Sequence, residues 1–192
     1  MDAETSAWGG EEMTKPKKTM NSSLKSLIVL LSICLVVAVL MAAIYALTAP
    51  KIEAANAAAE KEALRSVLPT ATKFEKIEGG HHESISSLYR DLGGSGYVAI
   101  LLAKGYDSAN PMKVAVGFDA EGKILAVKII SANGETSGIG TKVTNEEFLT
   151  QFVGEDETLT GVDTISGATI SSSAVKNAVR EACLAVAKET AS

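Results

Sequence analysis

The sequence predicts an α+β protein in which a single N-terminal transmembrane helix precedes an antiparallel sheet with flanking helices. Three observations predict this fold class. Residues 27–47 form an uncharged and almost wholly apolar run. Several short segments that suit β-strands follow this run and are separated by turn residues. These strands do not alternate strictly with helices, which disfavours a Rossmann fold.

We expect four segments along the chain. Residues 1–24 contain few apolar side chains, which predicts a disordered cytoplasmic tail. Residues 25–48 hold the transmembrane helix, and residues 49–70 form an alanine-rich stalk helix. Residues 71–192 form the extracytoplasmic domain.

The apolar run is long enough to cross a bilayer. At about 1.5 Å per residue, a helix over 27–47 spans roughly 31 Å, close to the thickness of the hydrocarbon core. A cleaved signal peptide is the alternative, although its apolar region usually covers only about 7–15 residues. The positive-inside rule places the N-terminus in the cytoplasm, because basic side chains gather on that flank, at Lys15, Lys17, Lys18 and Lys25. We therefore expect a single-pass protein of the plasma or inner membrane.

Hydrophobic periodicity predicts the elements beyond the membrane. Strands are expected at 73–78, 85–90, 97–104, 113–118 and 124–130, the last two joined by a turn at 119–122. Helices are expected at 51–67, 145–152 and 173–188. Pro50 is expected to break the helix that leaves the membrane, Asn145 to cap the second helix, and Ser171 or Ser172 to cap the third.

Composition excludes several classes of function. The chain has 192 residues and a formal net charge of −5, and it has no basic stripe that nucleic-acid binding would need. Cys34 lies in the apolar run and Cys183 in the last helix, without the spacing of a metal or Fe–S site, so no metal is expected. His81 and His82 indicate a polar loop, with metal binding as the less favoured alternative. The segment 138–142 lacks the spacing of a phosphate-binding P-loop.

Two glycine-rich loops remain as the candidate site. Residues 133–140 follow a strand, and residues 166–169 precede the last helix. Glycine permits close approach of the backbone to a ligand, and the start of a helix offers free N–H groups to an anion. Together the loops suit a phosphate that carries a flat ring. The alternative is that they are a tight turn and a serine-rich helix cap.

At these residues the chain resembles the FMN-binding domain family, and within it the G subunits of Rnf ion-translocating ferredoxin:NAD oxidoreductases. The C subunits of sodium-translocating NADH:quinone oxidoreductases are siblings. The resemblance covers nearly the whole chain, and its motifs are Glu-Thr-Ser-Gly-Ile-Gly at 135–140 and the segment 163–169, which ends in Ser-Gly-Ala-Thr. Ser137 stands where the family usually has proline, which loosens that loop.

The resemblance implies a covalent cofactor. FMN would be joined through a phosphoester bond to Thr169 by a separate flavin transferase that uses FAD. The residues themselves agree with an external enzyme, because a threonine hydroxyl is a weak nucleophile without a base and no His or Lys adjoins Thr169. Ser166, Gly167 and Ala168 are expected to present backbone to the phosphate. The resemblance also implies ring contacts from Thr136, Gly138, Ile139 and Gly140, with Glu135 organising their loop and Tyr97 as a further candidate.

The function that the resemblance implies is that of an electron carrier within a membrane-bound, redox-driven ion translocase. The chain would relay electrons between an Fe–S centre and another flavin in polytopic partner subunits, and would not be catalytic alone. Residues 27–47 carry no charge, so the ion path must lie in those partners. Two alternatives stay open: a membrane-tethered flavoprotein reductase or regulator, and a flavin-free extracytoplasmic sensor domain.

Overall fold

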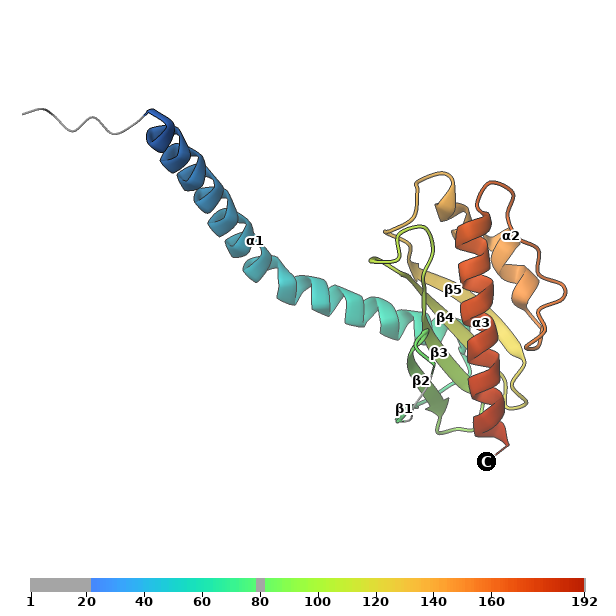
Figure 1. Ribbon diagram of the computed structural model, residues 1–192. Helices are drawn as coiled ribbons and strands as arrows, with labels where there is room; N and C mark the ends of the chain where they lie inside the picture. Colours follow the sequence, from blue (N-terminus) through green and yellow to red (C-terminus); the bar gives the residue numbers. More distant parts are fainter. Residues whose placement is uncertain (1–21, 79–81, 192) are drawn as a thin grey trace, which may run out of the picture. The chain divides into compact units, whose positions relative to one another are not determined.

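The computed structural model describes residues 22–78 and 82–191. The chain divides into two compact units, Met1–Lys51 and Ile52–Ser192. Helix α1 (Ser22–Val67) passes through this boundary, and the remaining elements all belong to the second unit (Figure 1). Residues 1–21 of the expected tail and His81 lie outside the described residues.

Helix α1 contains the apolar run. Within the part of the chain that the structure describes, it is the one helix that is long and apolar enough to cross a membrane. The expected break at Pro50 is wrong, because the helix continues through this residue. Proline removes a single backbone donor from the helical ladder, and this loss alone does not end the helix here.

The second unit is built on an antiparallel meander of five strands in the order β1-β2-β3-β4-β5. The strands are β1 (Phe74–Ile77), β2 (Ile85–Asp91), β3 (Tyr97–Ala103), β4 (Met112–Phe118) and β5 (Ile124–Ser131). The predicted strands and the predicted α+β class are confirmed. Asp119 closes the β4–β5 turn, where its Oδ1 accepts the backbone N–H of Lys123 at 2.7 Å, and Gly122 has a φ of +85°.

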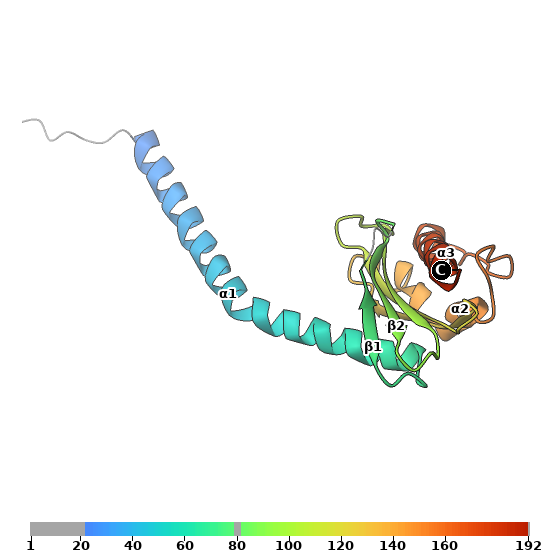
Figure 2. The same cartoon turned by 90° about the horizontal axis from the view of Figure 1, so that it is seen from below.

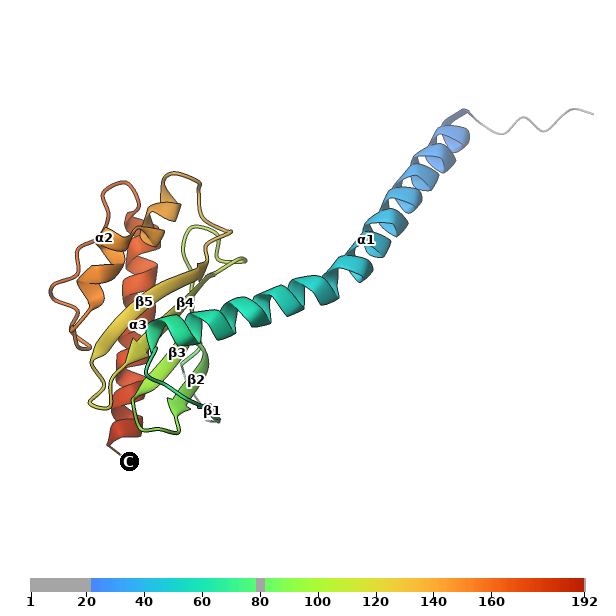
Figure 3. The same ribbon diagram turned by 180° about the vertical axis from the view of Figure 1, so that it is seen from behind.

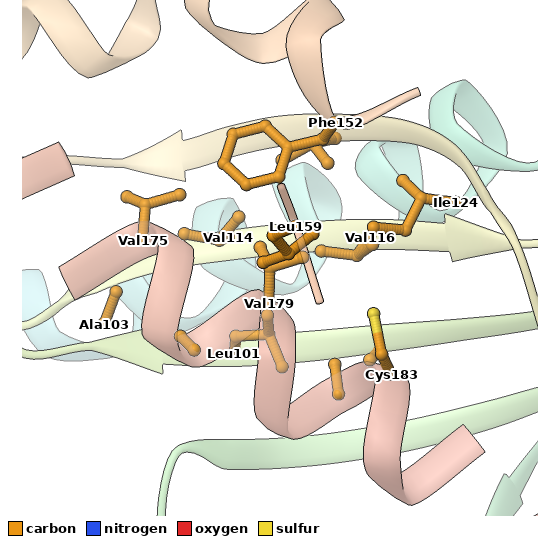
Figure 4. Packing of buried hydrophobic residues seen from close by; sticks show 14 of the residues in the cluster. Leu101, Ala103, Val114, Val116, Ile124, Phe152, Leu159, Val175, Val179 and Cys183 are labelled. Carbon is orange, nitrogen blue, oxygen red and sulfur yellow. The ribbon is translucent and has the colours of Figure 1, made fainter. Parts of the chain in front are cut away.

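One face of the sheet packs against α3 (Thr169–Thr190). Val175 and Val179 of α3 point toward Val114 and Val116 of β4 in the main core (Figure 4). Cys183 belongs to the same core, and its burial, reinforced by Glu157 and Asp156, raises the pKa of the thiol to about 12. The thiol is therefore neutral at physiological pH and serves as a small apolar side chain.

The opposite face of the sheet is covered by the C-terminal end of α1 (Figures 2 and 3). Leu64, Val67 and Leu68 are buried there against Val98 and Ile100 of β3. The last turns of the expected stalk are therefore part of the domain's core rather than a separate spacer. Contact is close enough that a Cβ added at Gly117 of β4 would lie 2.2 Å from the backbone oxygen of Val67.

Three short elements connect β5 to α3. They are the 3-10 helix η1 (Gly140–Thr144), helix α2 (Glu146–Leu149) and the 3-10 helix η2 (Thr150–Phe152). Asn145 takes the N-cap position of α2, although its side chain forms no capping hydrogen bond. Phe148 and Phe152 anchor this connection, with their rings 5.3 Å apart in an edge-to-face arrangement within the main core.

The last helix begins earlier than predicted. Helix α3 starts at Thr169 rather than at residue 173, and Ala168 is its N-cap residue, so the expectation that Ser171 or Ser172 caps it is wrong. Both serines are buried within the first turn. The hydroxyl of Ser172 bonds to neighbouring backbone, whereas that of Ser171 bonds to Glu135, 36 residues earlier in the chain.

Candidate functional site

The two glycine-rich loops meet at one end of the domain. The C-terminal ends of β3 and β5 and the N-terminal end of β4 lie together, because Ala103 pairs with Met112 and Lys113 pairs with Ser131. The loop after β5 and the start of α3 enclose a cavity of about 420 Å³. Its lining residues are Tyr106, Glu135, Thr136, Ile139, Gly140, Gly167, Ala168, Thr169, Ile170 and Ser171.

The start of α3 presents a hydroxyl and free backbone donors to this cavity. Gly167 has a φ of +80° with open space around it, and Thr169, exposed to solvent, is the first residue of the helix. The first backbone bond within the helix runs from Ser172 N to Ala168 O at 2.9 Å. The N–H groups of Thr169, Ile170 and Ser171 therefore have no intrahelical acceptor, which makes this turn suited to an anion.

Ser172 holds the turn that leads into α3. Its Oγ accepts the backbone N–H of Ile165 at 3.1 Å and donates to the carbonyl of Ala168 at 2.8 Å. Because Ser172 is fully buried, these bonds also satisfy a polar group that would otherwise be costly to bury. The hydroxyl therefore fastens the segment before the helix onto its first turn.

The loop after β5 is a series of tight turns. Glu135 N donates to Ala132 O at 3.0 Å, and Ile139 N donates to Thr136 O at 3.1 Å. Gly138 has a φ of +75°, and its N–H donates to Thr141 Oγ1 at 2.9 Å. These bonds hold the loop on both sides of Ser137, and Ile139 lines the cavity.

The carboxylate of Glu135 is buried between the loops. Its Oε1 accepts the backbone N–H of Tyr106 at 3.1 Å, and its Oε2 accepts the hydroxyl of Ser171. Glycines leave room for it: a Cβ at Gly105 would lie 1.9 Å from Oε1, and a Cβ at Gly140 would lie 2.5 Å from Oε2. The carboxylate thus joins three segments of the cavity wall.

Three large side chains with apolar surface are exposed to solvent where they line the cavity. Tyr106 is 71% exposed, Ile170 is 61% exposed and Ile139 is 50% exposed. All three line the cavity. Apolar side chains placed beside a few polar groups are typical of a small-molecule site, and here they suit a flat ring.

The structure places most of the predicted site residues in or beside this cavity. Ser166 and Gly138 adjoin lining residues without lining the cavity themselves. Sequence reasoning missed Tyr106, Ile170 and Ser171. A glycine followed by an aromatic residue just beyond a strand is the signal that could have pointed to Tyr106.

Tyr97 does not belong to the cavity. It begins β3, whereas the cavity lies beyond the end of that strand, roughly 20 Å away at about 3.3 Å per residue. Its side chain is half-buried against the main core. The expectation of a ring contact from Tyr97 is therefore corrected, and Tyr106 is the tyrosine that the fold brings to the site.

Comparison with known proteins agrees with this geometry. Residues 105–183 match the FMN-binding domain family, and residues 13–67 match the RnfG N-terminal region. The G subunit of the ion-translocating oxidoreductase complex of Methanosarcina acetivorans is 30% identical over 171 residues, which cover 82% of this chain and 91% of the relative. The chain belongs to the G-subunit family of Rnf complexes. A second member, the G subunit of the proton-translocating ferredoxin:NAD(+) oxidoreductase complex of Clostridium ljungdahlii, is 30% identical over 162 residues, which cover 78% of this chain and 83% of that protein.

The cavity fits FMN, the ligand of the matched domain family. Its volume of about 420 Å³ lies in the range of small-molecule sites. The start of α3 would hold the phosphate, where Gly167 contributes no side chain to obstruct it. Tyr106, Ile139 and Ile170 would hold the ring system. The phosphate would thus meet backbone N–H groups, and the ring would meet apolar side chains.

Proposed function

We propose that this chain is an electron-carrier subunit with covalently bound FMN, acting within a membrane-bound ion-translocating oxidoreductase. The observation that carries the proposal is the exposed hydroxyl of Thr169 at the wall of a cavity that fits FMN. Membership of the G-subunit family supports the assignment to a redox complex. The FMN-binding domain match supports the cofactor.

The attachment is a transfer of FMN from FAD to Thr169. A bond forms between Thr169 Oγ1 and the FMN phosphorus, the pyrophosphate bond of FAD breaks, AMP leaves, and the hydroxyl proton passes to a base. Lys176, seven residues further along the chain, donates to the carbonyl of Val162 at 2.6 Å and is thereby held away from this role. The base is then supplied by a flavin transferase, to which the exposed Thr169 is accessible.

The protein's own residues hold and shield the cofactor. Bound FMN supplies reversible one- and two-electron chemistry. The free N–H groups at the start of α3, and the positive end of the helix dipole, stabilise the phosphodiester anion. Ile139, Ile170 and Tyr106 exclude water from the ring, and the glycines of both loops let the backbone approach it.

The chain delivers electrons but does not conduct ions. Its membrane helix carries no charged side chain over residues 27–47, so polytopic partner subunits must supply the ion path. The chain relays electrons between an Fe–S centre and another flavin, both of which belong to those partners. The lysines that precede the membrane helix orient the N-terminus toward the cytoplasm and residues 49–192 toward the outside. A covalent bond retains FMN there, where a lost cofactor is not readily replaced.

Intact mass of the full chain tests the cofactor directly. Chain produced together with a flavin transferase should gain the mass of one FMN, less one water, on the peptide that contains Thr169. Thr169→Ala should lose this gain and the yellow fluorescence that survives SDS, whereas Thr169→Ser keeps a hydroxyl and should retain part of both. A normal yield of SDS-resistant flavin in Thr169→Ala would contradict the attachment site.

Orientation and assembly need separate measurements. A tag at the C-terminus should be cut by protease added outside intact cells, and complete protection of the tag would contradict the orientation. Purification through the same tag should recover polytopic redox subunits together with the chain. Recovery of the flavinylated chain alone from gently solubilised membranes would favour a free-standing reductase or regulator.

A further inference from the structure

We propose that Glu135 and Ser171 form a positioning pair that docks the ring loop, residues 135–140, onto the attachment turn, residues 166–171. The pair sets where the isoalloxazine ring lies and how easily it is reduced, whereas the neighbouring Ser172 shapes the attachment turn itself. This inference rests on the proposed function.

The first argument is the contrast between two adjacent serines. The hydroxyl of Ser172 bonds within its own segment, to Ile165, Ala168 and Thr169. The hydroxyl of Ser171 instead bonds to Glu135, a residue 36 positions earlier in the chain. Both serines are buried in the first turn of α3. Ser172 is therefore suited to fix a local backbone turn, and Ser171 to connect that turn to another loop.

The second argument is the space made for the Glu135 carboxylate. A Cβ at Gly105 or at Gly140 would lie within 2.5 Å of one of its oxygens. Its two hydrogen-bond donors come from the segment after β3 and from α3, while the residue itself lies after β5. All three segments line the cavity. A substitution at Glu135 would therefore alter the position of all three segments that line the cavity.

The third argument is electrostatic. Glu135 is an acidic side chain that is 8% exposed and lines the cavity. A buried negative charge opposes the arrival of an electron nearby, because the low dielectric of the interior strengthens the repulsion. The carboxylate thus lowers the midpoint potential of a ring held in the cavity. Replacing it with the neutral, similarly shaped glutamine should raise that potential.

The experiment uses the full chain made with its transferase, in four forms: unmodified sequence, Ser171→Ala, Ser172→Ala and Glu135→Gln. Intact mass gives the fraction carrying FMN, a redox titration gives the midpoint potential, and flavin fluorescence anisotropy gives the mobility of the ring. Thermal unfolding is measured in parallel, because a merely structural role would change stability without changing the potential.

We expect Ser172→Ala to lose more attached FMN than Ser171→Ala. Among the chains that carry FMN, Ser171→Ala should show lower anisotropy and a shifted potential, and Glu135→Gln a raised potential. Equal loss of FMN in the two serine variants would overturn the division of roles. Unchanged potential and anisotropy in both Ser171→Ala and Glu135→Gln would overturn the positioning pair. Absence of FMN from the unmodified sequence would instead contradict the proposed function.

Discussion

The turn after β2 and the loop after β5 are each built around one buried carboxylate, and the loop after β5 lines the cavity described above. Asp91 accepts the backbone N–H groups of Thr72, Lys73 and Ser95 at 3.1–3.3 Å. Glu135 accepts one backbone N–H and one hydroxyl, from Tyr106 and Ser171. Both carboxylates thus accept backbone N–H groups from residues outside the strands and helices, Thr72, Lys73 and Ser95 in one case and Tyr106 in the other.

The difference lies in where the donors come from. The donors to Asp91 belong to its own turn and to the neighbouring segment at β1, so this carboxylate fastens the edge of the sheet. The donors to Glu135 come from two segments that lie far from it in sequence, and all of them line one cavity. A buried carboxylate that binds nearby backbone stabilises a turn. One that draws distant segments together also shapes a site.

The largest effect is expected from adding a methyl group in the Asp91 turn. A Cβ at Gly96 would lie 1.9 Å from the backbone oxygen of Phe118, and Gly96 has a φ of +142°. A Cβ at Gly105 would also lie 1.9 Å from an oxygen, but this oxygen ends the side chain of Glu135. Gly96→Ala should therefore lower the free energy of unfolding by about 3 kcal/mol or more, and Gly105→Ala by less.

Thermal unfolding of the two alanine variants in detergent checks this order. A double variant tests the cause of the Gly105→Ala effect. Glu135→Ala removes the carboxylate that would clash with a Cβ at Gly105. Gly105→Ala should therefore cost less stability in the Glu135→Ala background than in the unmodified sequence. Additive effects would show that the carboxylate does not occupy the space beside Gly105.

The next effect is that of Asp91→Asn, with a defined dependence on pH. Burial alone would raise the pKa of Asp91, but donors from Ser95, Gly93 and Lys73 outweigh it and hold the pKa at about 2. Because the folded pKa lies below the unfolded value of about 3.9, the charged carboxylate stabilises the fold by about 2–3 kcal/mol at neutral pH. This contribution is fully present above about pH 5 and is lost progressively as the pH falls toward the folded pKa of about 2.

Denaturant unfolding of the unmodified chain and Asp91→Asn between pH 7 and pH 3 measures this difference. The gap in the free energy of unfolding should be widest at neutral pH and should begin to narrow below about pH 5. A gap that stays constant over this range would mean that the charge of Asp91 does not stabilise the turn.

A smaller loss of stability is expected for Glu135→Gln. Glutamine keeps one acceptor oxygen, so only one of the donors from Tyr106 and Ser171 loses its partner. One unsatisfied buried donor costs about 1–3 kcal/mol, but Ser171 Oγ can accept the glutamine N–H in its place, so we expect a loss of about 1 kcal/mol. Calorimetry of both variants, with and without attached FMN, would measure how much stability each substitution costs. Attached FMN should change the stability cost of Glu135→Gln but not that of Asp91→Asn.

The smallest effect is expected from an exposed carboxylate. Glu75 and Arg90 form an ion pair of 3.0 Å on the surface of β1 and β2, next to the Asp91 turn. Exposed pairs contribute about 0–1 kcal/mol, so Glu75→Gln should lower the melting temperature by no more than about 4 °C. A loss as large as that of Asp91→Asn would show that burial is not what separates these carboxylates.

Elements with a local signal were predictable along most of the chain. The apolar run, the five strands and the tight β4–β5 turn follow from hydrophobic periodicity and turn residues, which are properties of neighbouring positions. The Ser-Gly-Ala-Thr segment was also visible as a distinct motif before a helix. The start of that helix was predicted four residues too late, because the serines that resemble caps instead bond to the preceding turn and to Glu135.

By itself, then, the sequence determined the order of the elements, the apolar run that is long enough to cross a membrane, and the two loops that carry the candidate site. Only the tertiary structure decided that Tyr106 rather than Tyr97 reaches the cavity, that Ser171 bonds to Glu135, and that the end of α1 covers the sheet. The physical reason is that strands and turns form through contacts a few residues apart. The cavity and both faces of the sheet depend on contacts between segments 29 or more residues apart, such as that of Tyr106 with Glu135.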